Sequence, residues 1–352
     1  MKNGINFESN GKVSKYPLEL DLLDENGKEY EFFIIEDGVK TKISLVEMVD
    51  YQNQIVKSDI NSSISKHYTQ NTNSEVNTKN VIIGDGIKNT SSGNFTKNLS
   101  YGNDTQNTSS GHYTRNASCG HYTRNASSGV CTRNTSSGHY TVNVSCGHYT
   151  VNTSSGVYTQ NASGGNNSQN INSGNFTRNA SSGHYTRNVS CGHYTVNTSS
   201  GRYTRNIILG KNSICFDCGF NSIIKGVNGT WISLAEYEIN EKDILVPLFA
   251  LSAQIGNPNY TDNNGEMLKE NTYYCLLNKQ FHEVDISDGI QVVVLKTEKF
   301  KDLKIIKGKT FTKNQIDTFV VTNGTISAHG STKKKAIEDF KIKLKKLKLN
   351  KK

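Results

Sequence analysis

The sequence predicts a mainly β protein whose central part is a parallel β-solenoid of nine-residue repeats, with a small N-terminal β cap and a C-terminal α+β domain ending in a helix. Two regularities carry this prediction. Asparagine recurs at every ninth position from Asn71 to Asn206, sixteen times in succession. Glycine recurs with the same period from Gly84 to Gly219, again sixteen times. A period sustained over so many units is typical of architectures in which each unit packs on its neighbours.

The composition argues against a conventional hydrophobic core. Only 34% of the 352 residues are hydrophobic, and 30 glycines accompany three prolines. No apolar run reaches the ~18 residues of a membrane span, and residues 1–10 lack the basic-then-apolar order of a secretory signal. The seven cysteines are odd in number and follow the repeat instead of a disulfide framework. We therefore expect a soluble, unexported protein in a reducing compartment, with no membrane contact.

The alternation of side chains along a strand sorts each unit into two sets. In the unit from Gly111 to Cys119, the small polar residues Thr114, Asn116 and Ser118 share one side. We expect this set to face inward, where stacked amides and hydroxyls hydrogen-bond from coil to coil. The glycine supplies the positive φ or the tight approach that a corner needs. The predicted ladder includes Asn116, Asn125, Asn134, Asn143, Asn152, Thr114, Thr123, Gly111, Gly120 and Gly129.

Nine residues are too few to close a coil around any interior. Two or three units per coil are the alternatives, and we favour two, which gives a flattened roll. With two units, Arg115 and Arg133 stack on one face and Arg124 lies on the other.

The outward positions form the candidate binding face. From Ile87 to Phe216 the only acidic residue is Asp104, so rows of arginine interleaved with tyrosine would suit a nucleic-acid backbone and its bases. The competing interpretation, a solvated face, rests on the valines that interrupt the rows. The candidate residues are Arg115, Arg124, Arg133, Arg178, Arg187, Arg205, Tyr113, Tyr122, Tyr140 and Tyr149.

No metal or cofactor site is predicted. Calcium-binding nonapeptide rolls need an aspartate in every turn, which this array lacks. The histidines recur at one position of the unit, which suggests either a metal site or a corner residue. We favour the corner, because no acidic or cysteine partner recurs beside them. These residues are His67, His112, His121, His139, His148, His184 and His193.

No catalytic residues are predicted, and the sequence favours a protein that is not an enzyme. Cys215 and Cys218 form one Cys-x-x-Cys without a second pair, and Glu236 and Glu238 alternate on a strand without a pocket. His329 has no nearby nucleophile partner.

The array divides the chain into three parts, residues 1–60, 66–226 and 227–352. In the first part, Leu18 to Leu23 and Tyr30 to Ile35 flank Asp24-Glu25-Asn26-Gly27, which predicts a β-hairpin. We expect this hairpin to cap one open end of the solenoid, since an unprotected coil invites edge-to-edge association.

The third part mixes strands with a terminal helix. We expect strands at Trp231 to Tyr237, Ile244 to Leu251, Tyr273 to Leu277, Ile290 to Leu295, in part of Phe311 to Phe319, and at Phe319 to Ser327. Ser331 or Thr332 is expected to cap a helix with Ala336, Ile337, Phe340, Leu344 and Leu347 on its apolar face and lysines around it.

Several motifs of this part resemble a group of uncharacterised bacteriophage and prophage proteins that carry a nonapeptide array. They are Asn212 to Cys215, Gly219 to Ser222, Lys225-Gly226, Gly229 to Glu236, Asn271 to Leu276 and Ala328 to Thr332. The resemblance covers about residues 66–345 and implies the solenoid fold and a place in a bacterial host cell or a virion. This sequence has Asn and Thr where the group often has Ala. The array is also similar, more weakly, to the head repeats of trimeric autotransporter adhesins, without their stalk and anchor.

Three hypotheses about function follow. The first is a non-enzymatic phage- or prophage-encoded accessory protein, located in the cytoplasm, whose rigid solenoid is a scaffold for an unidentified protein partner. The second is nucleic-acid binding through the Arg and Tyr rows. The third is a virion fibre or adhesin-like receptor-binding protein, which predicts an oligomer, in particular a trimer.

Overall fold

A computed structural model describes residues 4–9, 12–14, 31–36, 39–43, 70–242, 244–287, 290–300, 302–311 and 316–349. Contacts divide the chain into two compact units, residues 1–64 with 79–81 and residues 65–78 with 82–352.

The N-terminal unit contains an antiparallel sheet of order β2-β1-β3-β4. Its strands are β1 (Gly4–Ser9), β2 (Lys12–Ser14), β3 (Glu31–Glu36) and β4 (Val39–Ile43). Strand β3 covers most of the predicted strand from Tyr30 to Ile35, and it pairs with β1 and β4. The predicted strand from Leu18 to Leu23 and the turn from Asp24 to Gly27 lie outside the described residues.

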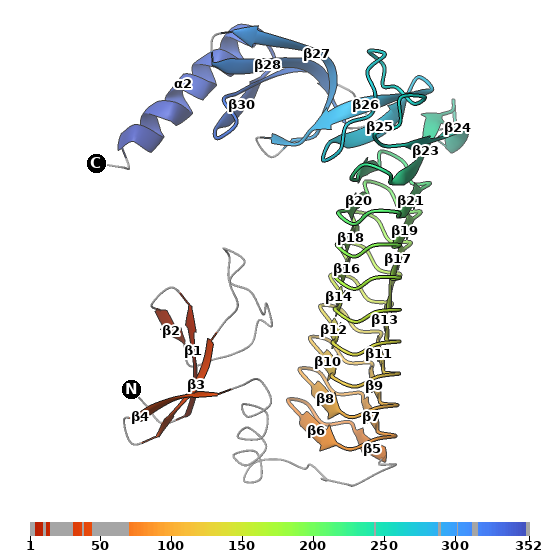
Figure 1. Ribbon diagram of the computed structural model, residues 1–352, viewed down its shortest axis with the longest axis vertical. Coiled ribbons are helices and arrows are strands. Elements are labelled where there is room, and N and C mark those ends of the chain that lie inside the picture. Colours follow the sequence, from red (N-terminus) through yellow and green to blue (C-terminus); the bar gives the residue numbers. More distant parts are fainter. Residues whose placement is uncertain are drawn as a thin grey trace. The chain divides into compact units, whose positions relative to one another are not determined.

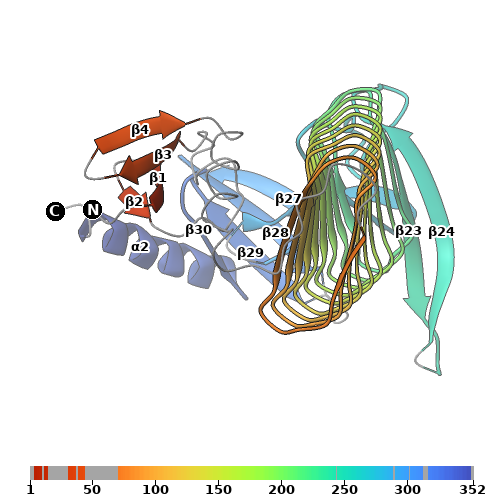
Figure 2. The ribbon, with the colours of Figure 1, turned by 90° about the horizontal axis from the view of Figure 1, so that it is seen from below.

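The repeat forms a parallel β-solenoid of about nine turns, in which successive strands alternate between two sheets (Figures 1 and 2). Sheet I contains β5 (Gln70–Asn73), β7 (Lys88–Ser91), β9 (Gln106–Ser109), β11 (Arg124–Ser127), β13 (Val142–Ser145), β15 (Gln160–Ser163), β17 (Arg178–Ser181), β19 (Val196–Ser199) and β21 (Ile214–Asp217). Sheet II contains β6 (Lys79–Ile83), β8 (Lys97–Tyr101), β10 (Arg115–Ser118), β12 (Arg133–Ser136), β14 (Val151–Ser154), β16 (Gln169–Asn172), β18 (Arg187–Ser190), β20 (Arg205–Ile208) and β22 (Ile223–Lys225).

The register confirms two repeats per coil. Arg115 pairs with Arg133 in sheet II, and Arg124 pairs with Val142 in sheet I. Each strand therefore lies beside the strand two repeats away, so residues 18 positions apart stack directly.

The interior is polar, and its hydrogen bonds are those that the repeat predicts. Asn116 Nδ2 donates to Asn134 Oδ1 of the next coil at 3.0 Å, and the same bond repeats from Asn98 to Asn206 in sheet II. Asn116 Nδ2 also lies 3.1 Å from Ser109 Oγ in the opposite sheet. Amides such as Asn116 bridge both sheets, and these bonds satisfy most polar groups of the interior, with Asn89 Oδ1 and Thr177 Oγ1 as exceptions.

The glycine at the corner provides a close approach between coils. A Cβ on Gly111 would lie 2.0 Å from the carbonyl oxygen of Gly93. The positive φ falls two residues later, at Tyr113 with φ of 56°. Of the two roles predicted for this glycine, Gly111 therefore fills the tight approach and not the positive φ.

The histidines complete the corner by accepting hydrogen bonds. The backbone N–H of Val130 donates to His112 Nδ1 at 3.0 Å, and in the preceding coil the N–H of His112 donates to Asn94 Oδ1 at 2.8 Å. The side chains of histidine and asparagine at this position therefore both accept a backbone N–H bond from the next coil. His67 lies outside the described residues.

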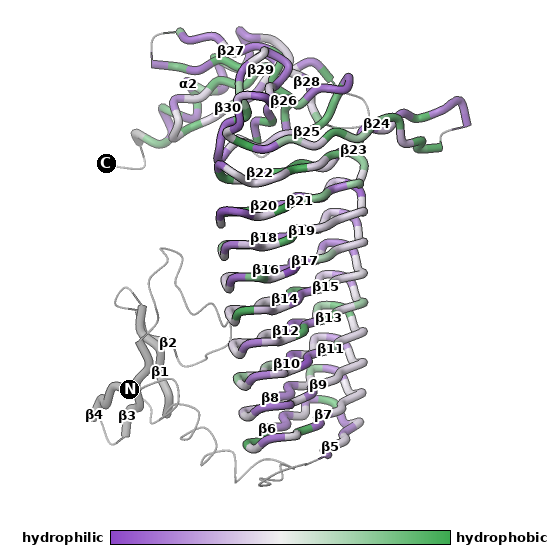
Figure 3. Tube along the Cα trace, turned by 45° about the vertical axis from the view of Figure 1, so that its right-hand side comes forward, coloured by the Kyte–Doolittle hydropathy of each residue, from purple (hydrophilic) through white to green (hydrophobic). Residues whose placement is uncertain are grey.

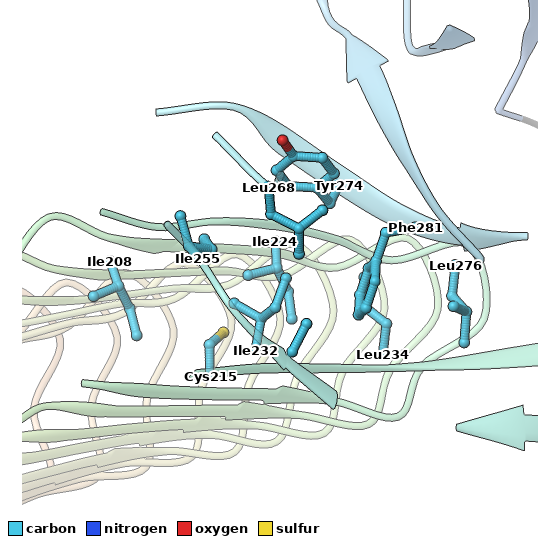
Figure 4. Close-up of a cluster of buried hydrophobic side chains, with 11 residues drawn as sticks. Ile208, Cys215, Ile224, Ile232, Leu234, Ile255, Leu268, Tyr274, Leu276 and Phe281 are labelled. Atoms are coloured by element: carbon cyan, nitrogen blue, oxygen red, sulfur yellow. The ribbon is translucent and has the colours of Figure 1, made fainter. Parts of the chain in front are cut away.

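An apolar core closes the C-terminal end of the solenoid (Figure 4). Cys215 and Ile224 occupy the asparagine positions of the last coil, beside Asn197 and Asn206. Ile232 and Leu234 of the following strand pack on them. The change from amides to aliphatic side chains ends the polar ladder.

The C-terminal strands extend both sheets. They are β23 (Trp231–Ile239), β24 (Leu245–Gln254), β25 (Tyr273–Leu277), β26 (Gln280–Asp285), β27 (Val292–Phe300), β28 (Leu303–Thr310), β29 (Asp317–Thr322) and β30 (Ser327–Gly330). Strands β23 and β24 continue sheet I, and β25 to β30 continue sheet II as antiparallel neighbours.

The terminal helix α2 (Lys333–Leu349) packs Ala336 and Phe340 against Ile305, Val321 and Ala328. The expected helix cap is present, since the backbone N–H of Lys335 donates to Thr332 Oγ1 at 3.2 Å. Among the described residues, no helix has both the length and the apolar character that crossing a membrane requires.

A buried carboxyl replaces a serine of the ladder in the last coil. Asp217 stacks on Ser199 and is 2% exposed. Its Oδ2 accepts a hydrogen bond from Asn206 Nδ2 at 2.7 Å. Burial raises the pKa of Asp217 to about 6, although hydrogen bonds from Thr204 and other donors oppose the change.

We expect Asp217→Asn to stabilise the protein at neutral pH. The folded state holds the Asp217 proton more tightly than an unfolded chain with a pKa near ~3.9 does, so stability is greatest below pH ~4 and falls as the pH rises to about 6. Above that pH the cost is roughly 3 kcal/mol at most, at about 1.4 kcal/mol per pKa unit. Asn172 already occupies the equivalent position in β16.

The measurement is the free energy of unfolding from urea titrations between pH 4 and 8. The wild type should lose stability across this window, and Asp217→Asn should flatten the curve. Asp104→Asn, at an exposed corner, is the control. An Asp217→Asn protein that is less stable than the wild type at pH 7 would contradict the assignment.

Candidate interaction surface

The candidate arginines are divided between the two sheets. Arg115, Arg133, Arg187 and Arg205 point outward from sheet II, and Arg124 and Arg178 belong to sheet I. The structure therefore does not bring all six together on one face. Each column is also interrupted, since Val151 follows Arg133 and Val142 follows Arg124.

The longest cationic row lies on the first coils of sheet II. Lys97, Arg115 and Arg133 stack in register on β8, β10 and β12. Partial burial and, to a smaller extent, the charge of Arg115 lower the pKa of Lys97. Like charges held this close favour an anionic partner that would relieve their repulsion.

The candidate tyrosines are divided between the two corners of the coil. Tyr113 and Tyr149 precede strands of sheet II, and Tyr122 and Tyr140 precede strands of sheet I. On the sheet II corner, Cys131 and Asn167 interrupt the sequence of rings. On the sheet I corner five aromatic residues follow one another without a break. We call them the Tyr122 column: Tyr122, Tyr140, Tyr158, Phe176 and Tyr194.

The rings of the Tyr122 column stack face to face along the solenoid axis. Their centroids are 5.0 to 5.1 Å apart, and the interplanar angles are 5° to 17°. Each of the three inner rings has its two faces covered by neighbours, yet Tyr140 is still 49% exposed. The exposed parts are ring edges and hydroxyl groups. Nucleic-acid bases stack on aromatic faces, so the inner rings offer no such platform.

The backbone of this corner does not require an aromatic residue. Asn212 and Asn221 occupy the same position of the repeat with φ of 54° and 53°, and Tyr140 adopts φ of 55°. Asparagine tolerates this left-handed conformation, whereas a bulky side chain there is strained. Strained residues cluster at functional sites. Five exposed rings in succession at a strained position therefore make this column the candidate interaction surface.

A shallow groove of about 330 Å³ opens at the first ring of the column. Asp104 occupies the same position in the preceding coil of this corner. One face of Tyr122 therefore has no stacked neighbour in the column. Arg124 and Gln106 add a cation and an amide beside this face. The groove is lined by Asp104, Gln106, Tyr122, Arg124, Tyr140 and Val142.

Within the described ranges, no group of three His, Cys, Asp or Glu side chains is placed to hold a metal ion. The corner histidines have a structural use as hydrogen-bond acceptors instead. Burial raises the pKa of the Cys215 thiol well above its ordinary value, with a further contribution from Asp217, while Cys218 is exposed.

Comparisons with protein-family models, with curated proteins and with solved structures found no match to this chain.

Two parts of the surface are missing from the residues that the sequence singled out. One is Phe176, which joins Tyr158 to Tyr194 in an unbroken column that appears only when residues are compared in steps of 18. The other is a group of exposed apolar side chains beyond the last repeat, including Phe216 and Trp231.

Proposed function

We propose that the protein is a non-enzymatic scaffold of phage or prophage origin whose solenoid holds a protein partner along the Tyr122 column. The observation that carries this proposal is the run of five exposed rings at a corner where asparagine would serve the backbone at least as well. The resemblance of the C-terminal motifs to phage and prophage proteins supports the origin.

The chemistry of the column favours a protein partner over nucleic acid. Ring edges carry a partial positive charge, so they attract carbonyl oxygens, carboxylates and the faces of other aromatic rings. Tyrosine hydroxyl groups add donors and acceptors at every position of the column except Phe176. A protein surface offers all of these groups, and aromatic residues are enriched in protein interfaces.

The test replaces tyrosine by asparagine at the corner. A variant with Asn at all five positions of the column should still fold, because the relief of left-handed strain offsets the loss of the stacked rings. A benzophenone side chain placed at position 140 in the otherwise wild-type protein should form a discrete protein adduct in the bacterial host. Excess wild-type protein should compete for this adduct, and the five-Asn variant should not.

Tyr149→Asn, on the interrupted corner, is the matched control and should compete as well as the wild type. An adduct that every variant competes for equally would contradict the proposal. So would an adduct that a nuclease destroys, because that result would identify nucleic acid as the bound molecule.

The second candidate function is polyanion binding at Lys97, Arg115 and Arg133. It is favoured by the in-register stacking of these cations and by the lowered pKa of Lys97. This function predicts nucleic-acid affinity that falls steeply as salt rises.

A further inference from the structure

The outward face of sheet I changes from polar to apolar where the repeats end. Within the array this face carries Arg124 and Gln160. In the last coil it carries Ile214 and Phe216, which are 37% and 49% exposed, and Trp231 of β23 lies in register beside Ile214. Figure 3 shows more apolar residues in these last strands than in the coils below them.

The hairpin of β23 and β24 carries further exposed apolar side chains. Its strand β24 is the edge strand of sheet I. Ile244 is 55% exposed and Leu248 is 50% exposed, in a run of apolar residues that continues to Leu251. Figures 2 and 3 show the tip of the hairpin reaching past the outline of the coils. We call Ile214, Phe216, Trp231, Ile244 and Leu248 the hairpin patch.

A hairpin with exposed apolar side chains favours a binding partner that buries them. Two strands alone are marginally stable in water, and an exposed apolar edge strand is a template for association. Pro247 has no N–H to donate and lies opposite Tyr237, next to a register shift in the pairing of β23 with β24. We therefore expect the occupant to pack on the side chains of the hairpin instead of adding a strand along its edge.

The segment that contains the hairpin is acidic, which favours a basic binding partner. Residues 227–289 contain three lysines and ten acidic residues, a net charge of −7. Glu238 and Glu241 are exposed on the hairpin itself. Residues 290–352 contain 17 lysines and five acidic residues, a net charge of +12, which exceeds the +9 of the whole chain. The chain thus carries both halves of a complementary pair.

Helix α2 presents the matching surface. One side packs on β29 and β30 through Ala336 and Phe340. Ile342 lies on the opposite side by helical spacing and is 53% exposed, and Lys341 and Lys345 lie on the flank between it and the packed side. Figures 1 and 2 place α2 and the hairpin on opposite sides of the C-terminal strands, so the helix that meets the hairpin belongs to another copy.

We propose that the protein associates with itself, with the hairpin patch of one copy docking on the exposed face of α2 of a second copy. Ile342 of the second copy packs among Leu248 and Ile244, and Lys341 and Lys345 face Glu238 and Glu241. This contact joins two different surfaces, so it is heterologous, and repeated contacts build a ring or an open chain. The association needs no other molecule and does not depend on the Tyr122 column.

The test is the mass of the purified full-length chain by light scattering across a concentration series. The wild type should exceed the 39.0 kDa of one chain. Leu248→Gln and Ile342→Gln should each raise the dissociation constant by on the order of tenfold or more. Val76→Gln, at another exposed apolar side chain in the first coil, is the control and should leave the constant unchanged.

Charge reversal identifies the two surfaces. Glu238→Lys with Glu241→Lys, and separately Lys341→Glu with Lys345→Glu, should each shift the protein towards a single chain. An equimolar mixture of the two variants should recover the wild-type mass, because every contact between unlike copies pairs opposite charges again. Circular dichroism of each variant checks that it is folded.

A wild type that stays at the mass of one chain up to concentrations of about 100 μM, in the weak range of specific association, overturns the proposal. Reversal variants that keep the wild-type mass, or whose mixture recovers nothing, overturn it as well. Loss of the partner at the Tyr122 column with self-association intact would refute the proposed function alone.

Discussion

Gly165→Ala will destabilise the solenoid by roughly 3 kcal/mol, whereas Gly164→Ala will not. The two glycines are neighbours in the chain. A Cβ on Gly165 would lie 1.9 Å from the carbonyl oxygen and 2.3 Å from the carbonyl carbon of Gly147, and both are backbone atoms that cannot move aside. A Cβ on Gly164 would find its nearest neighbour at 3.9 Å. Ser and Cys occupy that position in other repeats.

The free energy of unfolding from urea titration measures the difference. Gly164→Ala should match the wild type or gain up to about 1 kcal/mol, since alanine reduces the freedom of the unfolded chain. Hydrogen exchange should show that Gly165→Ala loosens the two coils that meet at Gly147 first. Equal losses for the two variants would mean that the corner has more room than the structure gives it.

Asn134→Leu will cost about 3 kcal/mol, because it breaks the amide ladder in the middle. Asn134 Nδ2 donates to Asn152 Oδ1 at 3.0 Å and lies 2.8 Å from the Val144 carbonyl oxygen. Its Oδ1 accepts from Asn116 Nδ2 at 3.0 Å. Leucine has a similar volume, so the loss comes from buried polar groups without partners.

The neighbouring outward position provides the control for this substitution. Arg133→Gln should change the free energy of unfolding by less than about 0.5 kcal/mol. Glutamine already occupies the equivalent position in β9, β15 and β16. Equal free energies of unfolding for Asn134→Leu and Arg133→Gln would mean that the interior tolerates apolar side chains. The amide ladder would then not explain why asparagine recurs in every repeat.

The interior of the solenoid was predictable because its residues vary little from repeat to repeat. Most buried asparagines bond to an asparagine 18 residues away, so the ladder imposes a period that is visible in one sequence. The outward arrangement was harder to predict. A period of nine is the same in both sheets, so it does not show that Arg115 and Arg124 face opposite ways until the number of repeats per coil is known.

The left-handed corner left a signal that can be recognised in retrospect. Asn167, Asn212 and Asn221 replace tyrosine at this position, and asparagine is enriched in that conformation. The aromatic residues conceal the pattern, because tyrosine alone suggests an ordinary extended residue. The position of each ring in a stack depends on coil geometry and could not be deduced from composition.

The C-terminal domain was predicted less completely, for a reason visible in β28. Ile305 and Ile306 are adjacent and both buried, since one faces the core under α2 and the other faces a second core with Val292. A strand with apolar residues on both faces lacks the alternation that identifies strands. Strand β26 was missed as well. By contrast, β25 spans Tyr273–Leu277 as predicted, and helix α2 begins one residue after its predicted cap at Thr332.

Each repeat makes half a coil, and this geometry constrains how the array can change in length. The segment from Thr135 to Gly156 is nearly repeated 45 residues later, from Ala180 to Gly201. That offset is an odd number of repeats, so the copy of β13 in sheet I is β18 in sheet II. The ladder accepts this exchange because both sheets share one interior. Gaining or losing a single repeat would therefore preserve the fold while turning the C-terminal domain half a revolution relative to the first coils, and only changes by pairs of repeats would keep both ends facing their original partners.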